Sequence, residues 1–152
     1  MHKLLLLTLG IFLFVSCKKE LSPEEQLQYD LDQIKQYLTD KNLAASSTSS
    51  GLHYIITTEG TGGNPSANST VTVKYKGYLL DGTIFDETSG TSTATFPLFN
   101  LIQGWQEGIP LLKTGGKGTF LIPSYLGYGS SPVGTIPANS VLIFEIELVK
   151  YQ

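Results

Sequence analysis

Hydrophobic residues follow two spacings along this chain, and the spacing changes near residue 50. In "SPEEQLQYDLDQIKQYLTDKNL" they recur every three or four positions, which predicts an amphipathic helix within residues 18–43. Ser22 is a suitable N-cap, Pro23 suits the first turn, and Glu25 completes a capping box. The apolar residues of this helix share one face: Leu27, Leu31, Ile34 and Leu38.

The apolar stripe of this helix needs a partner. Three partners are compatible with the sequence: the helix's own domain, a second copy of the chain in a homodimer through helix 23–42, and a client polypeptide. Packing on its own domain is the favoured interpretation. The segment "AASSTSSG" (44–51) is small and polar, which predicts a flexible linker that lets the helix stand off from the rest of the chain.

From residue 52 the hydrophobic period changes to two, the period of β-strands. The last strand shows this most clearly, because Leu142 and Phe144 fall on one face while Glu145 and Glu147 fall on the other. An Asp-Gly pair inside "YKGYLLDGTIFD" predicts a tight hairpin. The predicted strands are 52–58, 70–80, 82–86, 117–123 and 140–150.

One segment within this body has helical spacing. In residues 100–116 the apolar positions match a helix face, Asn100 is a candidate N-cap, and Gly115 and Gly116 are expected to end the helix. Pro110 removes a backbone hydrogen bond, so the helix should be short or bent. The sequence therefore predicts an α+β domain over residues 52–152, an antiparallel sheet wrapped around one short helix.

Composition and charge exclude several classes of function. The chain has ten Lys, no Arg and a net charge of −3, which argues against a nucleic-acid partner. Its two His and one Cys lie far apart, so the sequence predicts neither a metal site nor a Cys-His nucleophile, and no cofactor is expected. Gly-x-Ser-x-Gly and P-loop motifs are absent from the sequence.

The N-terminus has the features of a targeting signal. One Lys is followed by an apolar run over residues 4–15, which matches the core of a signal peptide covering residues 1–16. The run ends in "FVSC", which resembles a bacterial lipobox with Phe14 at a position where Leu is common. We therefore expect Cys17 to be lipidated as the mature N-terminus, which would anchor the chain to a membrane of the cell envelope, facing the periplasm. An ordinary secretory signal is the alternative.

Three stretches carry a resemblance to a known family. They are "VTVKYKGYLLDGTIFDET", "FPLFNLIQGWQEGIPLLKTGGKGTFLIPSYLGYG" and "IPANSVLIFEIELV", and in this order they resemble the signatures of FKBP-type peptidyl-prolyl cis-trans isomerases. The match runs from about residue 52 to the end of the chain. The N-terminal helix and lipobox also resemble lipoprotein members of that family. The resemblance implies a half-barrel sheet around one helix, with an aromatic pocket between them.

The resemblance also implies roles for individual residues. Trp105 would form the pocket floor, the Ile102 N–H and the Tyr128 hydroxyl would hold substrate carbonyls, and Asp86 would orient hydrogen bonds or polarise the twisted carbonyl. Walls and further substrate contacts would come from six side chains: Tyr75, Phe85, Phe144, Leu101, Ile136 and Phe96. On sequence alone, each of these residues has an ordinary structural interpretation as core, surface or local cap.

Such a pocket suits the isomerisation of Xaa-Pro bonds in polypeptides. The barrier of roughly 20 kcal/mol is the loss of amide resonance, and the planar ground state is more dipolar than the twisted transition state. An apolar pocket therefore weakens the ground state relative to the transition state and needs no nucleophile or metal. The expected role is to assist the folding of cell-envelope proteins.

Three departures from the family pattern concern the pocket rim. Ala94 stands where many members have a large residue, Thr135 precedes Ile136-Pro137, and no Arg accompanies the pocket Asp. These changes give weight to an alternative, a proline-binding module or chaperone with low turnover. A structural lipoprotein that uses the domain only as a scaffold is a further alternative.

Overall fold

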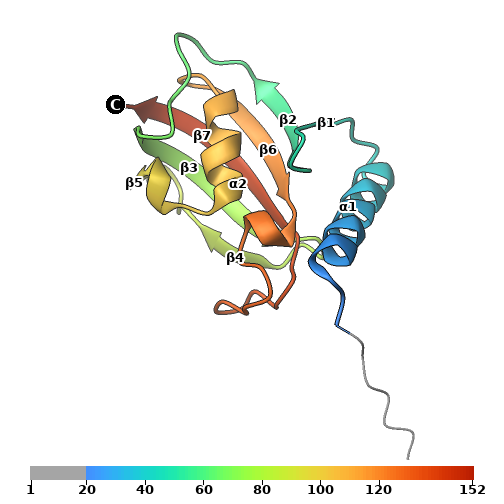
Figure 1. The fold of residues 1–152 in the computed structure, drawn as a ribbon. Coiled ribbons are helices and arrows are strands. Elements are labelled where there is room, and N and C mark those ends of the chain that lie inside the picture. The colour runs from blue at the N-terminus through green and yellow to red at the C-terminus, as the bar shows by residue number, and fades with distance from the viewer. Residues whose placement is uncertain (1–19) are drawn as a thin grey trace, which may run out of the picture.

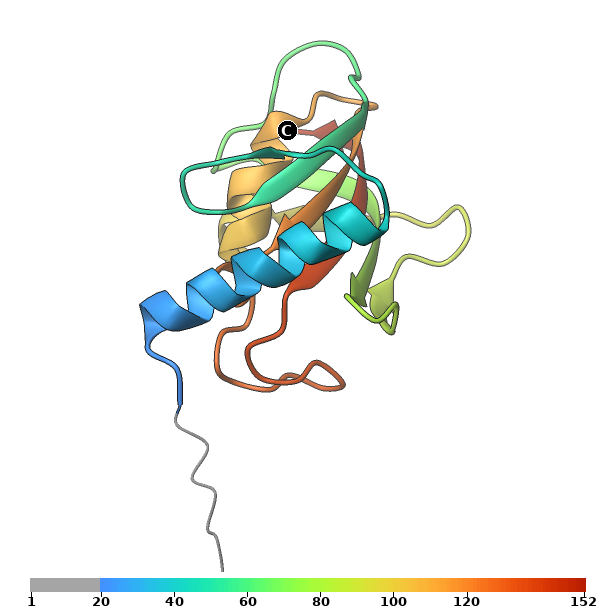
Figure 2. The same cartoon turned by 90° about the vertical axis from the view of Figure 1, so that its right-hand side faces the viewer.

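The computed structural model describes residues 20–152, so the predicted signal peptide and Cys17 lie outside the described residues. A curved antiparallel sheet forms the body, with one helix on its inner face and another on its outer face (Figures 1 and 2). This arrangement confirms the predicted α+β class with a half-barrel sheet and a preceding helix.

Seven strands make up the sheet, which has the order β1-β2-β6-β7-β3-β4, while β5 pairs with β3. The two longest strands, β3 (Thr70–Leu79) and β7 (Leu142–Tyr151), pair along most of their length at the centre. The other strands are β1 (Ser46–Ser47), β2 (His53–Thr58), β4 (Ile84–Glu87), β5 (Ala94–Pro97) and β6 (Lys117–Ile122). The sequence did not predict β1 or β5.

The inner face of the sheet packs on α2 (Gln103–Gly108) to form the main core. Alternate residues of the central strands point to this face, as the period of two predicts. Phe120 and Ile122 of β6 and Leu142 and Phe144 of β7 are all buried there. These strands and α2 enclose the largest cluster of buried apolar side chains within residues 20–152.

The outer face carries a second apolar cluster beneath α1 (Pro23–Asp40). Ile34 is fully buried against Leu121, Val141 and Ile143. Figure 2 shows α1 lying along the sheet on the side away from α2. The helix therefore packs on its own domain, as favoured from the sequence, and the homodimer remains a prediction.

The start of α1 follows its sequence signals closely. The Ser22 hydroxyl accepts a hydrogen bond from the Glu25 N–H at 3.2 Å, and the Glu25 carboxylate accepts one from the Ser22 N–H at 2.8 Å. The capping box is thus confirmed. The helix ends at Asp40, with Lys41 as its C-cap, so it is shorter than the predicted range of 18–43.

The segment expected to be a flexible linker is instead attached to the domain. Ser46 and Ser47 form β1, which pairs with Tyr54 and His53 of β2. The Ser50 hydroxyl lies 2.7 and 2.8 Å from the two carboxylate oxygens of Glu107 on α2. Small polar residues are typical of linkers, but these make specific hydrogen bonds, so the helix does not stand off from the sheet.

The helical segment predicted over residues 100–116 is divided into short pieces. A 3₁₀ turn, η1 (Leu98–Asn100), precedes α2, and a second, η2 (Ile109–Leu111), follows it. Asn100 is therefore not the N-cap, which is Ile102. Pro110 lacks the N–H that a continuing α-helix needs, so the chain tightens into η2 and leaves helical geometry well before Gly115.

Among residues 20–152, no helix has the length and apolar character needed to cross a membrane. The same residues contain no group of three or more His, Cys, Asp or Glu side chains that could hold a metal ion.

The packing of α1 predicts a large effect for Ile34→Ala. Because this side chain is fully buried, its truncation should lower the free energy of unfolding by about 2–5 kcal/mol. Leu43→Ala is the matched control, since Leu43 is 43% exposed and its truncation should cost only about 0.5 kcal/mol. Urea unfolding measures both. An unfolding midpoint that depends on protein concentration would contradict packing within one chain.

Candidate active site

A cavity of about 200 Å³ lies between the inner face of the sheet and the start of α2. Strands β3, β4, β5 and β7 supply most of its walls, and the chain around α2 and the loop after β6 supply the rest. Its lining consists of Tyr75, Phe85, Asp86, Phe96, Leu101, Ile102, Trp105, Tyr128 and Phe144. Nine of the ten residues expected from the sequence are therefore brought together in one place.

Trp105 lies at the centre of this aromatic cluster and is only 4% exposed. The rings of Tyr75 and Phe144 each lie 5.2 Å from it, centroid to centroid, at 82° and 88°. Phe96 lies 6.3 Å away at 82°. These edge-to-face contacts are the arrangement that aromatic rings prefer. The indole Nε1 is buried, with no hydrogen-bond partner among residues 20–152.

Two glycines of α2 allow the helix to approach the sheet closely. A Cβ on Gly104 would lie 2.5 Å from Cγ2 of Ile122, and one on Gly108 would lie 2.8 Å from Cδ1 of Phe120. Real Cβ atoms do not tolerate such contacts. The helix thus lies directly on β6, and this position brings Trp105 against the rings of β3 and β7.

Gly77 makes room for the opposite wall. Phe85 and Phe144 pack edge to face with a centroid distance of 5.4 Å at 79°. A Cβ on Gly77 would lie 2.5 Å from Cε2 of Phe85 and 2.7 Å from Cε1 of Phe144. This glycine, two residues after Tyr75, therefore creates space for the two rings that bound the cavity.

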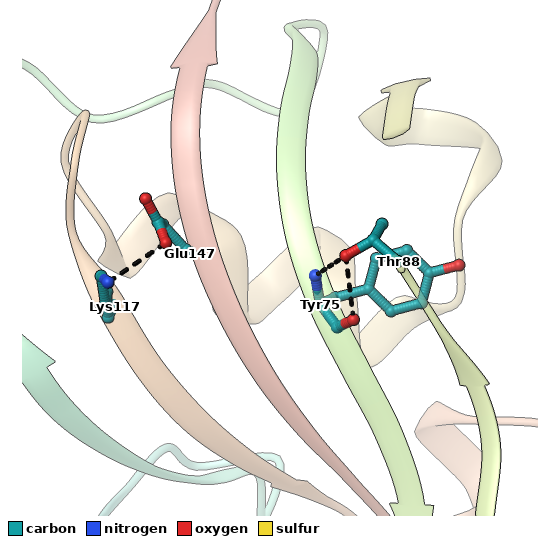
Figure 3. A network of polar contacts seen from close by, with 4 residues as sticks. All are labelled: Tyr75, Thr88, Lys117 and Glu147. Carbon is teal, nitrogen blue, oxygen red and sulfur yellow. Dashed lines mark hydrogen bonds and ion pairs between the residues drawn. The ribbon is translucent and has the colours of Figure 1, made fainter. Parts of the chain in front are cut away.

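Asp86 is the charged residue of the cavity wall, and Tyr75 holds its carboxylate. The Tyr75 hydroxyl donates a hydrogen bond of 2.6 Å to Oδ2 of Asp86. The main chain of Tyr75 is itself fixed by Thr88, whose Oγ1 accepts from the Tyr75 N–H at 3.1 Å and donates to its carbonyl at 3.3 Å (Figure 3). The position of the carboxylate is thus set by two strands.

Besides the indole Nε1 of Trp105, two hydrogen-bond donors at the cavity have no partner within residues 20–152. One is the Ile102 N–H at the start of α2, where the carbonyl of the same residue accepts from Trp105 and Gln106. The other is the hydroxyl of Tyr128, which is 37% exposed. An apolar cavity with two such donors is suited to bind carbonyl groups of an extended chain.

The pKa values of the two cavity tyrosines are raised. For Tyr75 burial is the larger cause, followed by the hydrogen bond to Asp86 and the charge of that carboxylate. For Tyr128 burial is again the larger cause, and the charge of Asp86 adds to it. Because the ordinary value is about 10 and both shifts are upward, both hydroxyls stay protonated through neutral pH and remain donors.

Three other residues singled out from the sequence do not line the cavity. Ile136 is 5% exposed and packs in the main core instead. Ala94 pairs with Val73 at the edge of the sheet, and Thr135 is exposed. The departures at Ala94 and Thr135 therefore fall outside the cavity wall.

Several residues that support the site could not be assigned a role from the sequence. Thr88 and Gly77 lay within recognised motifs but had no assigned role. Gln106 was also missed; its side-chain amide donates to the Leu101 carbonyl at 2.7 Å and fixes the chain before α2. Its polar side chain on the first turn of the helix is the sequence signal that could have identified Gln106.

The outer face of the same strands is charged and differs in character from the cavity. Lys117 of β6 and Glu147 of β7 form an ion pair of 3.1 Å between half-exposed side chains (Figure 3). The Tyr78 hydroxyl donates to Glu145 at 3.0 Å. Exposed pairs of this kind contribute little to stability. The aromatic cavity, by contrast, lies on the inner face.

Comparisons with known proteins agree with this geometry. The sequence profile of the family described as FKBP-type peptidyl-prolyl cis-trans isomerase matches residues 62–149, more than half of the chain. The FKBP-type peptidyl-prolyl cis-trans isomerase FkpA of Aeromonas hydrophila is 46% identical over 110 residues, which are 72% of this chain and 41% of that protein.

Two further relatives extend the comparison. The outer membrane protein MIP of Legionella longbeachae is 43% identical over 102 residues, 66% of this chain and 44% of that protein. The crystal structure of FkpA from Escherichia coli superposes with a TM-score of 0.74 and 35% identity, covering 85% of this chain and 62% of that one. The chain thus spans about two fifths of the length of the curated relatives it matches.

The close contacts at Gly77 predict that Gly77→Ala disturbs the cavity. The added methyl group should lower the free energy of unfolding by about 1–3 kcal/mol, because Phe85 and Phe144 must move. Urea unfolding and the near-ultraviolet circular dichroism of the aromatic cluster measure the change. Lys74→Ala on the same strand is the control and should change neither. An unaltered spectrum for Gly77→Ala would show that the rings do not need this space.

Proposed function

Because this chain belongs to the FKBP-type peptidyl-prolyl cis-trans isomerase family, we propose that it accelerates rotation about Xaa-Pro bonds of polypeptides in the aromatic cavity. The observation that carries the proposal is the combination in one cavity of an aromatic lining and two unpartnered donors, the Ile102 N–H and the Tyr128 hydroxyl.

The aromatic lining supplies the main rate effect. A planar Xaa-Pro amide is stabilised by resonance that separates charge, and the twisted transition state has lost that resonance. Moving the bond from water into the cavity removes hydration that favours the planar form. The twisted form loses less, so the barrier falls by differential binding. In this scheme Trp105 contacts the proline ring, and Tyr75, Phe85 and Phe144 surround it.

The two donors supply orientation. The Ile102 N–H and the Tyr128 hydroxyl hold main-chain carbonyls on either side of the reacting bond. One donor belongs to the backbone at the start of α2, and the other belongs to a side chain on the loop after β6. Because both ends of the segment are held, part of the entropy cost of orienting the substrate is met when it binds and no longer adds to the barrier for rotation.

Asp86 and Tyr75 act as a pair in this proposal. The 2.6 Å hydrogen bond fixes the carboxylate at the wall, where its charge faces the reacting carbonyl group. That carbonyl group becomes more ketone-like when the bond twists. A fixed negative charge near its carbon therefore interacts differently with the planar ground state and the twisted transition state. The substrates are proline-containing polypeptides whose proline side enters the apolar cavity.

The proposed location is the cell envelope, with Cys17 as a lipid anchor. The support is the apolar run over residues 4–15, the "FVSC" sequence and the similarity to an outer membrane protein. From there the domain would assist the folding of envelope proteins. Further activities of the longer relatives are proposed for this chain only where its residues 20–152 contain the corresponding regions.

The cavity predicts a specific pattern of rates. The purified chain should accelerate cis-to-trans relaxation of short Xaa-Pro peptides, and Tyr128→Phe should reduce kcat/KM about tenfold through the loss of one hydrogen bond. Phe85→Ala should reduce it further by opening the wall. Phe99→Leu is the matched control, because Phe99 is 57% exposed and does not line the cavity. Circular dichroism checks that each variant is folded.

Two outcomes would contradict parts of this proposal. Equal rates for wild type and Tyr128→Phe would remove the hydroxyl from the mechanism. No acceleration of any peptide by the folded chain would exclude the isomerase, and a binding module for proline-containing segments would take its place. Quenching of Trp105 fluorescence by the same peptides would then measure that binding.

The anchor predicts a change in cell fractionation. Wild type expressed in a bacterium with lipoprotein processing should enter the membrane fraction and incorporate a labelled fatty acid. Cys17→Ser should lose the label and appear in the soluble fraction, because the thiol that carries the lipid is gone. Incorporation of the label by Cys17→Ser would show that Cys17 is not the attachment site.

A further inference from the structure

A buried carboxylate on α1 contacts the loop that carries Tyr128. Asp30 is fully buried, although it lies on the helix that covers the outer face. Its Oδ2 accepts a 2.7 Å hydrogen bond from the N–H of Ser124, and its Oδ1 accepts a 2.7 Å hydrogen bond from the Gln26 side chain. No ion pair to Asp30 occurs within residues 20–152. A buried carboxylate needs such partners, because its desolvation costs several kcal/mol.

Ser124 begins the turn η3 (Ser124–Leu126), and its two main-chain polar groups connect Asp30 to the chain around Tyr128. While its N–H donates to Asp30, its carbonyl accepts from the Gly127 N–H at 2.9 Å and from the Gly129 N–H at 2.8 Å. These two glycines stand on either side of Tyr128. The main chain around the tyrosine is therefore tied to one residue, Ser124, whose N–H is held by α1. Figure 1 shows this turn (orange) next to α1.

The segment after α1 makes a second link between the two sides of the cavity. The Tyr125 hydroxyl, also in η3, donates to the Ser50 carbonyl at 2.5 Å. The Ser50 hydroxyl in turn bonds to Glu107 of α2, the helix that carries Trp105. Residues 23–51 lie outside the part of the chain that the family profile matches, which is 62–149. This N-terminal segment thus joins the floor of the cavity to the loop that supplies the Tyr128 hydroxyl.

We propose that Asp30 is a positioning residue for the isomerase, acting through the main chain of Ser124 to place the Tyr128 hydroxyl over the cavity. This inference rests on the proposed function. Asp30 does not line the cavity, and its effect is transmitted by the hydrogen bonds of the η3 turn. A side-chain oxygen that accepts a hydrogen bond is needed at this position because the buried Ser124 N–H, in a residue 1% exposed, has Asp30 as its acceptor within the described residues.

The test is a double-mutant cycle on the full chain with a short Xaa-Pro peptide. Asp30→Ala should reduce kcat/KM about tenfold, in the same kinetic parameter that Tyr128→Phe affects. The double variant Asp30→Ala with Tyr128→Phe should be no slower than Tyr128→Phe alone, because Asp30 acts only through that hydroxyl. Losses that multiply in the double variant would overturn the proposal.

Two further variants separate positioning from stability. Asp30→Asn keeps a side-chain oxygen that accepts from the Ser124 N–H, so it should recover most of the activity that Asp30→Ala loses. Asp32→Ala is the matched control, because Asp32 is exposed and accepts from Gln28 on the same helix in the same i, i+4 pattern, with no contact to η3. It should leave kcat/KM unchanged. Equal activity for Asp30→Ala and wild type at a temperature where both are folded would overturn the proposal.

A readout that does not use activity keeps this inference distinct from the proposed function. In NMR spectra, Asp30→Ala should shift the Ser124, Gly127 and Gly129 amides and the Tyr128 ring signals, whereas Asp32→Ala should not. If wild type accelerates no peptide but these shifts occur, the proposed function fails while the positioning of Tyr128 by Asp30 stands. If Asp30→Ala leaves the Tyr128 signals unchanged in an active enzyme, the positioning role fails alone.

Discussion

The close approach of α2 to the sheet is the constraint on which the rest of the site depends. Because Gly104 and Gly108 have no side chains, the helix rests directly on Ile122 and Phe120 of β6. At this distance Trp105 meets the rings of Tyr75 and Phe144 at 5.2 Å. A helix displaced by even one methyl group would separate the floor of the cavity from its walls. It would also move the Ile102 N–H, which stands at the N-terminus of the same helix.

The two faces of the central strands differ in polarity, and the outer face is apolar only where α1 covers it. On the outer face of β7, Ile143 is buried beneath α1, whereas Glu145 further along is exposed. The helix covers only one end of the sheet, so the strand pattern is apolar on both faces there and alternating elsewhere. The end that α1 covers is the end from which η3 and the Tyr128 loop emerge, since β6 leads directly into η3.

Local sequence signals predicted those parts of the molecule whose structure depends on interactions between residues close in sequence. The capping box of Ser22 and Glu25 was predictable because both partners lie within one turn, and strand alternation predicted the buried face of β7. The nine cavity residues came from the family resemblance and not from spacing, because strands distant in sequence bring them together. Asn100 had the right residue type for a cap but is part of η1, whereas the backbone leaves extended geometry at Ile102.

The remaining errors share a cause, which is that tertiary contacts override composition. Residues 44–51 read as a linker, yet Ser50 binds Glu107 across 57 positions of sequence. Asp30 gave no signal at all, since an acidic residue on an amphipathic helix is ordinarily solvated. Only the fold reveals that a peptide N–H 94 positions away needs its carboxylate.

The difference between the two cavity donors explains why such a remote contact matters. The Ile102 N–H belongs to the backbone at the start of a packed helix, so the fold fixes its direction. The Tyr128 hydroxyl is at the end of a side chain in the connection between β6 and β7, where backbone and side chain both have freedom to lose on binding. Hydrogen bonds at Gly127 and Gly129 remove much of the backbone freedom before substrate arrives, and they are only as well fixed as the Ser124 peptide they share. A buried leucine at position 30 would fill the same space without the desolvation of a charge. The presence of a polar acceptor there is accounted for by the buried Ser124 N–H that donates to it.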